Sequence, residues 1–376
     1  MLKIAIVGCG KIADAHAWAI QSNAGGEIVC CSDTELLMAQ QFSERFHVKR
    51  YYSNMEAMLE ETKPDVVHIT SPPQTHYSIA RECLKHGCHV YVEKPFTLYA
   101  TEAEELLALA TEEGLSVTVG HDEQFSHVAR RMRRLIQSGY LGGRPVHMES
   151  TWCYDLGSDA YANALFRDKK HWVRKLPGRL LQNLISHGVA KIAEFLLGDN
   201  PQVMAHGFVS PLLRSAGEGE IVDELRVVIR DEERTTAYFS FSSQMRPSLH
   251  EFRLFGPKNG LFLDEDQQIL IKLRGKRYKS YAEKFIPPVT LAGQHLRNLL
   301  RNGRFFLARD FHMDSGKKYL IESFYSSIVD RTPLPIPYGQ ILLTSRIMDA
   351  IFEQLSARCS PVTKLPLNSS VLATSI

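Results

Sequence analysis

The chain has 376 residues, which is long for one compact core and predicts two domains. Hydrophobic residues make up 44% and charged residues 23%, as in ordinary soluble globular proteins. The formal net charge of +2 argues against a general binder of nucleic acids or membrane surfaces, and no apolar run approaches the roughly 20 residues that span a bilayer. Lys3 leads straight into a strand pattern, so the N-terminus does not look like a signal peptide.

The first 120 residues alternate between β-branched apolar runs and stretches of helical period. The predicted strands are 3–8, 27–33, 65–71, 89–95 and 116–122, and the predicted helices include 34–46, 75–87 and 100–114. Apolar strands separated by helices are typical of a parallel sheet covered on both faces. With right-handed crossovers, this pattern predicts a doubly wound α/β domain of the Rossmann type.

After about residue 122 strands dominate. They are predicted at 144–154, 203–209, 221–230, 235–243, 249–256, 260–265 and 268–274, and the predicted helices are 123–139, 183–198, 320–330 and 341–357. Short turns between several of these strands suit antiparallel neighbours. We therefore predict an N-terminal Rossmann domain, residues 1–122, and a C-terminal α+β domain, residues 123–376, with an open and mainly antiparallel sheet.

Two glycines stand where the first strand should pass to the first helix, in Gly8-x-Gly10-x-x-Ala13. A bound nucleotide, a bare tight turn and chance could each account for them. Gly8 would permit a tight turn, Gly10 would let the backbone approach a pyrophosphate, and Ala13 would let the helix pack on the strand. The amides at the helix start, where Lys11 and Ile12 lie, would then face the phosphates.

Asp33 ends the second predicted strand, where an acidic side chain can hydrogen-bond the 2′-hydroxyl of the cofactor's ribose. Thr34 and Glu35 follow, so a 2′-phosphate would meet negative charge. The strand, the glycines and the acid together favour a dinucleotide site over a bare turn. They predict NAD as the cofactor, with NADP less suitable.

Two more segments follow strands of this domain, "TSPPQTHYSIA" (70–80) and "YVEKPFTLYATEAEEL" (91–106). Together with the glycine motif they resemble the glucose-fructose oxidoreductase/inositol dehydrogenase (Gfo/Idh/MocA) family. The resemblance implies an NAD(P)-dependent dehydrogenase that acts on a sugar, a nucleotide-linked sugar or a cyclitol. It also implies self-association, as a homodimer or homotetramer, through the open sheet of the second domain.

In such proteins the lysine of the Glu-Lys-Pro motif lies between nicotinamide and substrate, which here implies Lys94. The peptide bond before Pro95 is usually cis in the family. Burial and the like charge of nicotinamide would lower the pKa of Lys94, so that it could hydrogen-bond a substrate hydroxyl or relay its proton. An ordinary surface lysine is the alternative.

The loop that lines the cofactor in the family matches Ser71 and Pro72 here, and Glu93 is expected beside the cofactor as well. Prolines would stiffen this loop. His76 could line the cofactor too, but it could equally cap the next helix or lie on the surface.

The family's second-domain motif is a glycine-rich turn followed by Asp-x-x-x-His on one helix face. Here His187 is present, Asn183 replaces the aspartate, and the turn is reduced to residues 177–179. Imidazole titrates near neutral pH, so His187 could take the hydroxyl proton, although a lone helical histidine is often structural. Asn183 cannot act as a base but could orient the substrate.

Further substrate contacts are expected from aromatic and polar residues near the cleft. His121 lies close to a strand end, and the segment 151–178 is rich in aromatic and basic residues that suit a sugar-binding loop. The candidates in that segment are Tyr154, His171, Trp172 and Arg174. A packed loop with core aromatics is the alternative for each of them. Asp122 and Gln124 depart from the Asn and Arg that relatives often have, and no chemistry is assigned to them.

Basic residues gather in 129–135 and 295–311. Arginines would suit the diphosphate of a nucleotide-linked substrate, whereas a solvated helix face is the simpler interpretation of the first cluster. The apolar residues of the second cluster could pack on a partner subunit.

The seven cysteines are odd in number and fit no zinc-binding pattern. We expect reduced cysteines in a cytoplasmic protein without a structural metal. Two alternatives to a dehydrogenase stay open: an NAD-dependent glycosidase of the same fold, and a non-catalytic regulator that senses NAD(P).

Overall fold

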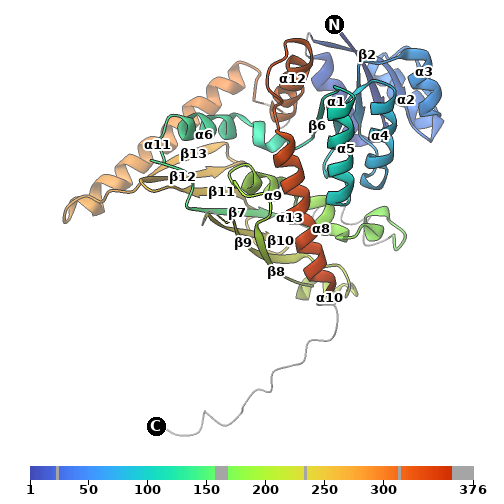
Figure 1. Cartoon of the computed structure of the whole chain (residues 1–376). Coiled ribbons are helices and arrows are strands. Elements are labelled where there is room, and N and C mark those ends of the chain that lie inside the picture. Colours follow the sequence, from blue (N-terminus) through green and yellow to red (C-terminus); the bar gives the residue numbers. More distant parts are fainter. Residues whose placement is uncertain (23–24, 157–167, 233–234, 312–314, 358–376) are drawn as a thin grey trace, which may run out of the picture.

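The computed structural model describes residues 1–376 except 23–24, 157–167, 233–234, 312–314 and 358–376. Two sheets organise the chain, as Figure 1 shows, with the N-terminal sheet and its helices to one side of a larger C-terminal sheet. The predicted α/β fold class is confirmed, since one sheet is parallel and the other is mostly antiparallel.

The first sheet has six parallel strands in the order β3-β2-β1-β4-β5-β6. Its strands are β1 (Leu2–Val7), β2 (Gly26–Ser32), β3 (Tyr51–Tyr52), β4 (Val66–Ile69), β5 (His89–Val92) and β6 (Val117–Val119). The order reverses at β1 and β4, so the loops after these two strands lie together at the carboxyl edge of the sheet. In doubly wound folds ligands bind at this point.

Helices connect these strands, as the alternating sequence pattern predicts. They are α1 (Lys11–Gln21), α2 (Leu36–Phe46), α3 (Met55–Thr62), α4 (His76–Lys85) and α5 (Ala100–Glu112), with a short 3-10 turn η1 (Pro73–Thr75) before α4. The short strand β3 and helix α3 carry too few periodic residues to be predicted from the sequence.

The second sheet has seven strands in the order β13-β12-β11-β7-β10-β9-β8, antiparallel except where β10 runs parallel to β7. They are β7 (His147–Cys153), β8 (Gln202–Phe208), β9 (Glu224–Arg230), β10 (Thr236–Ser242), β11 (His250–Phe255), β12 (Asn259–Asp264) and β13 (Ile269–Arg274). Side chains alternate along them: Val227 and Phe239 are buried, whereas Val228 and Tyr238 are exposed. One face therefore packs on the core and the other is open.

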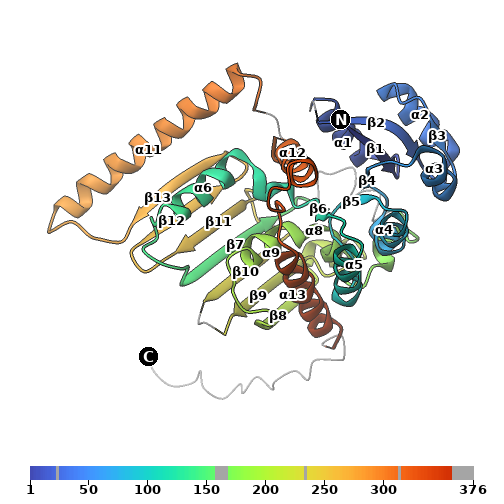
Figure 2. The same ribbon diagram turned by 45° about the horizontal axis from the view of Figure 1, so that its top comes forward.

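Three helices contact the strands of this sheet from its covered face, namely α6 (His127–Gln137), α9 (Ser186–Ala193) and α13 (Tyr338–Ala357). The shorter helical pieces are η2 (Asp122–Phe125), η3 (Trp172–Lys175), α8 (Arg179–Leu184) and α10 (Pro211–Ser215). The long helix α11 (Ala282–Leu307) lies along the edge strand β13, as Figure 2 shows clearly. The single helix predicted over 183–198 is wrong: α8 and α9 are separate helices, and Ile185 lies between them.

The C-terminal helices join the two halves. Leu320 and Phe324 of α12 (Ser315–Val329) belong to the hydrophobic core of the first sheet. Helix α13 contributes Ile341 to that core and Ile347 and Ile351 to the core of the second sheet. Helix α12 thus packs with the first domain although it follows the second in sequence, and the domain division at residue 122 stays a prediction.

No helix in the described part of the chain has the length and apolar character that crossing a membrane requires. Within the same residues, no cluster of His, Cys, Asp and Glu is arranged to hold a metal ion. Six cysteines are described, and all six are buried free thiols.

Candidate active site

The turn after β1 shows why a glycine is needed at position 8. Gly8 has a φ of +94°, and a Cβ atom there would lie 2.5 Å from the backbone nitrogen of Ser71. Gly10 precedes α1, and no heavy atom lies within 4 Å of the place where its Cβ would be. Ala13 is fully buried, while Lys11 and Ile12 are exposed. The turn is therefore closed on the side of β4 and open above the start of α1.

The carboxylate of Asp33 lies beside this turn. Its Oδ2 accepts a hydrogen bond from the backbone N–H of Cys9 at 2.8 Å, and its Oδ1 accepts one from Glu35 at 2.9 Å. Two backbone donors thus hold the carboxylate in place, and its remaining lone pairs stay available to a ligand hydroxyl.

The loops after β4 and β5 are tied together by a buried histidine. His76 lies 2.9 Å from the carbonyl oxygen of Ser71 through Nε2 and 2.9 Å from that of Pro95 through Nδ1. Its side chain is fully buried, so the alternative of a surface histidine is wrong. Ser71 itself bonds Thr75 through its hydroxyl, and Pro72 is exposed beside it.

Lys94 follows β5 and reaches across to the second half of the chain. Its ammonium donates a hydrogen bond of 2.9 Å to the backbone carbonyl of Asn183. Burial lowers the pKa of Lys94 from its ordinary value, despite the opposing carboxylates of Glu93 and Asp122. The Lys94–Pro95 peptide bond is cis, as the resemblance implies. Lys94 therefore lies at the junction of the two sheets and is not a surface lysine.

His187 lies at the same junction, in the first turn of α9. Trp152 stacks on its ring at a centroid distance of 5.5 Å, and His121 approaches edge-on at 5.9 Å. Its Nδ1 atom is buried without a hydrogen-bond partner and lies 3.9 Å from Oδ1 of Asp122. Burial, followed by the charge of Lys94 and the neighbouring His121, lowers the pKa of His187 well below its ordinary value. The imidazole is therefore neutral at neutral pH, as a proton acceptor must be.

The spacing of Asn183 and His187 does not have the geometry that we expected. Because α8 ends at Leu184 and α9 begins at Ser186, the two residues lie on two consecutive short helices that meet at Ile185. The carboxylate nearest to His187 is that of Asp122, which follows β6. Asp122 was assigned no role from the sequence.

Other predicted substrate-contact residues bond or stack on neighbouring side chains, or lie next to residues that the structure does not describe. Arg174 donates a hydrogen bond of 2.7 Å to Glu218, and Trp172 stacks on His171. Tyr154 lies just after β7 and is partly buried. Residues 157–167 of the proposed sugar-binding loop lie outside the described residues.

Comparison with known proteins identifies both halves of the chain. Residues 2–121 match the model of the oxidoreductase family with an NAD-binding Rossmann fold, and residues 129–262 match the GFO/IDH/MocA C-terminal domain. The chain belongs to the Gfo/Idh/MocA family.

Named relatives of this Gfo/Idh/MocA protein act on sugars and cyclitols. D-glucoside 3-dehydrogenase of Escherichia coli is 32% identical over 142 residues, which are 38% of this chain and only 40% of that protein. The scyllo-inositol 2-dehydrogenase (NAD(+)) of Bacillus subtilis is 22% identical over 82% of this chain and 89% of that protein. The crystal structure of an NAD-binding oxidoreductase from Klebsiella pneumoniae has the same fold, with a TM-score of 0.75, 20% identity, and coverage of 95% of this chain and 97% of that one.

The residues present fit NAD, the cofactor of this Gfo/Idh/MocA domain. The open space above Gly10 leaves the start of α1 accessible to a pyrophosphate, and no side chain caps that helix N-terminus. Asp33 stands at the end of β2, where the ribose of a nucleotide bound there would lie.

Replacing Asp33 with serine is expected to weaken NAD binding by roughly ten- to a hundredfold, because it removes a charged hydrogen-bond acceptor. The affinity for NADP should change less, so the ratio of the NAD affinity to the NADP affinity should fall. Isothermal titration calorimetry with both cofactors measures this. Glu44→Gln is the matched control, since that carboxylate lies exposed on α2 and bonds only Gln40 among the described residues. Equal losses in both variants would contradict the role of Asp33.

The buried His121 makes the stability of the protein depend on pH. Burial, followed by the charge of Lys94, lowers the pKa of His121 to about 3. An unfolded histidine titrates near 6.5, so the unfolded chain binds more protons below that pH. The stability contribution of neutral His121 is therefore complete above pH 6.5 and is lost as the pH falls toward 3, by about 1.4 kcal/mol per pH unit.

Urea unfolding at pH 7.5, 6.0 and 5.0 tests this prediction. His121→Gln should reduce the slope of the unfolding free energy against pH by the contribution of about one proton. His86→Gln, at an exposed position of the same domain, serves as the matched control. An unchanged slope in His121→Gln would show that this histidine is already protonated in the folded protein.

A buried ionic cluster adjoins the site, and no local pattern in the sequence predicts it. Lys317 of α12 is 2% exposed and contacts two carboxylates, Glu93 at 2.7 Å and Asp122 at 3.0 Å. His16 of α1 bonds the same oxygen of Glu93 at 2.8 Å. Burial by itself raises the pKa of Glu93, but Lys317 and His16 hold it well below its ordinary value. Glu93 thus bonds internal partners, and its expected place beside the cofactor stays a prediction.

Proposed function

We propose that this protein is an NAD-dependent dehydrogenase that oxidises a hydroxyl group of a sugar, a nucleotide-linked sugar or a cyclitol, or reduces the corresponding ketone. The observation that carries the proposal is the meeting of Lys94 and His187 at the junction of the two sheets. Lys94 reaches the backbone of α8, and the neutral His187 lies on the next helix. Both residues adjoin the edge of the NAD-binding domain where a ligand binds.

In this proposal Lys94 binds the substrate oxygen and His187 takes the hydroxyl proton. Lys94 donates hydrogen bonds from an ammonium group whose pKa is lowered by burial, so it can also release a proton to the substrate oxygen. His187 is neutral and has a buried Nδ1, which leaves Nε2 as the nitrogen for the substrate. Bound NAD supplies the hydride acceptor.

Asp122 takes the place of the carboxylate that Asn183 cannot provide. A shift of about 1 Å would bring its Oδ1, now 3.9 Å away, into hydrogen-bond range of Nδ1 of His187. Such a bond would fix the imidazole in the tautomer with Nε2 free and would raise its basicity. Lys317 holds the other carboxylate oxygen, so Asp122 acts as a positioning residue.

Asp122→Asn is expected to lower kcat by about a hundredfold with a smaller effect on KM. Loss of the negative charge also lowers the basicity of His187, so the acid limb of the kcat profile should move to lower pH. Steady-state kinetics between pH 5 and 9 measure both effects. Asp122→Glu should restore part of the rate, and an unshifted pH profile would reduce Asp122 to a structural role.

The test of the function is turnover by the purified protein with NAD or NADP and a panel of sugars, UDP-sugars and inositols, followed at 340 nm. NADH formation with one substrate class supports the proposal. Release of free sugar without net NADH would identify a glycosidase, and ligand binding without turnover across the panel would identify a sensor. His121, Tyr154, Trp172 and Arg174 are the residues to vary once a substrate is known.

We also propose that the protein is cytoplasmic and self-associates as a homodimer or homotetramer through the open face of the second sheet. Exposed apolar residues on this face, among them Met204, Val228 and Tyr238, support the assembly. Light scattering after gel filtration tests it.

A further inference from the structure

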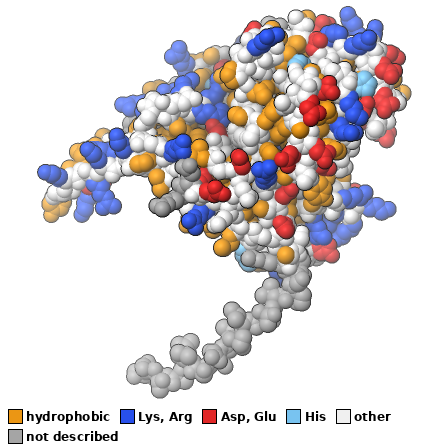
Figure 3. Space-filling view, in the orientation of Figure 1, with side chains coloured by type: hydrophobic (Ala, Val, Ile, Leu, Met, Phe, Trp, Pro, Cys, Tyr) orange, Lys and Arg blue, Asp and Glu red, His pale blue; other side chains and the backbone are white. Residues whose placement is uncertain are grey.

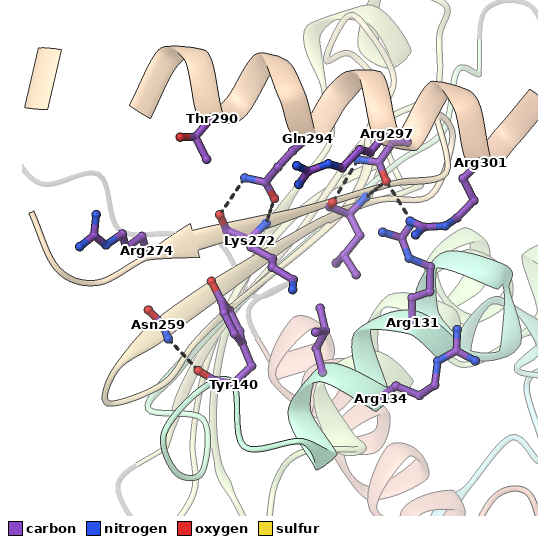
Figure 4. Close-up of a pocket in the computed structure, with 13 residues that line it drawn as sticks. Arg131, Arg134, Tyr140, Asn259, Lys272, Arg274, Thr290, Gln294, Arg297 and Arg301 are labelled. Atoms are coloured by element: carbon purple, nitrogen blue, oxygen red, sulfur yellow. Dashed lines mark hydrogen bonds between the residues drawn. The ribbon is translucent and has the colours of Figure 1, made fainter. Parts of the chain in front are cut away.

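The two basic clusters of the sequence meet in space. Arg131 and Arg134 lie on α6, and Arg297 and Arg301 lie on α11, which follows more than a hundred residues later. Figure 4 shows Arg301 descending from α11 toward Arg131, which rises from α6, while Arg297 lies along the underside of α11. The first cluster is therefore not simply a solvated helix face.

The space between these helices is a pocket of about 740 Å³, with β13 as its floor. Six cationic side chains line it: Arg131, Arg134, Lys272, Arg274, Arg297 and Arg301. No acidic side chain of the described residues lines it. Leu135, Leu270 and Tyr140 add apolar walls, and the NH2 groups of Gln294 and Asn298 bond backbone carbonyls of β13.

The described residues supply no counter-charge to the positive charge of the pocket. Among the described residues, none of the six cations forms an ion pair with a carboxylate. Arg131 bonds only the neutral side chain of Asn298, at 3.0 Å. Burial, followed by the charges of Arg301 and Arg134, lowers the pKa of Arg131 to about 10. Like charges gathered in this way are unfavourable until an anion binds among them.

The modest net charge of the chain conceals this concentration. Residues 272–309 hold ten lysines and arginines against a single glutamate, whereas the whole chain has a net charge of only +2. In the space-filling view, Lys and Arg dominate the charged side chains on the projecting arm that α11 forms (Figure 3). The rest of the molecule is therefore acidic on balance, and an anionic ligand would be drawn to this one region.

We propose that the pocket between α6, β13 and α11 binds a ligand that carries phosphate groups. Arginine guanidinium groups present paired N–H donors that match phosphate oxygens, and four arginines converge here from two helices. The volume accommodates a drug-sized or headgroup-sized molecule. Neither Lys94 nor His187 lines this pocket, so it is a second site, separate from the candidate active site.

Phosphate groups could come from a soluble metabolite or from the headgroups of an anionic membrane. Helix α11 turns a row of apolar side chains to solvent, among them Val289, Leu296 and Phe306, which are 57 to 74% exposed. Basic amphipathic helices with such a face bind anionic membrane surfaces. The experiment therefore needs one arm for each source.

The test uses the full chain with saturating NAD, so that the dinucleotide site is filled. In one arm, tripolyphosphate is titrated by calorimetry. In the other, the protein is sedimented with vesicles of phosphatidylglycerol and phosphatidylcholine, with pure phosphatidylcholine vesicles alongside. Saturable binding in the first arm identifies a soluble phosphate ligand, and sedimentation with the anionic vesicles alone identifies a membrane headgroup.

The double variant Arg297→Glu/Arg301→Glu should weaken that binding at least tenfold, because each charged hydrogen bond to phosphate contributes roughly a factor of ten. Lys284→Glu/Arg304→Glu carries the same charge change on the same helix, outside the pocket lining, and should lose less than half of the binding. The double variant Arg134→Gln/Arg297→Gln removes two positive charges without reversing them, so it tests the same loss of binding with less risk of misfolding. Failure to bind either probe, or equal losses in the pocket and control variants, would overturn the proposal.

Discussion

Replacing Lys94 with methionine is expected to lower kcat by roughly a thousandfold while leaving NAD binding largely intact. Methionine keeps most of the side-chain length but removes every hydrogen-bond donor to the substrate oxygen. We propose that the cofactor is bound elsewhere, by the turn at Gly8 and by Asp33, and neither of these forms a hydrogen bond with Lys94 within the described residues. The loss should therefore fall on the chemical step.

Single-turnover kinetics and calorimetry with NAD separate the two effects. Lys85→Met is the matched control, since Lys85 is exposed on the neighbouring helix α4 and makes only a long ion pair with Glu82. Loss of NAD binding with turnover retained would reverse the assignment of Lys94. Unchanged turnover would place the chemistry on another residue.

Much of the fold could be predicted because its signals are local. Continuous β-branched runs and helix-ending glycines mark the parallel strands and the helices between them within windows of about ten residues. The break between helices at Ile185 was not predicted, because the apolar periodicity runs on through it without a proline.

The site was predictable only where a motif carried it. Lys94 and His187 follow from short patterns, but Asp122 and Lys317 are far apart in sequence and meet only through the packing of α12 on the first domain. A lysine in the sequence of α12 gives no sign of its partners. The arginine clusters show the same limit, because the first segment alone has the pattern of a solvated face and the second that of a partner contact, and only the fold brings them together.

Lys317→Met is expected to destabilise the protein by about 3 to 5 kcal/mol, since it leaves the buried Glu93 and the partly buried Asp122 without their common cation. In the native protein, burial opposes the charge on Lys317, but the two carboxylates raise its pKa well above the ordinary value. Without Lys317, burial should raise the pKa of Glu93 instead. The destabilisation should then be largest above neutral pH and shrink toward pH 5, where Glu93 can bind a proton.

Urea unfolding at pH 5.0 and 8.0 measures this effect. Lys318→Met changes the next residue, an exposed lysine 4.0 Å from Glu322, and should alter stability by less than about 1 kcal/mol. The triple variant Lys317→Met/Glu93→Gln/Asp122→Asn should recover part of the loss, because no unpaired charge is then left buried. Equal stability of Lys317→Met and wild type at pH 8.0 would mean that water reaches these carboxylates. Lys317 would then not hold Asp122 firmly enough for Asp122 to position the imidazole of His187.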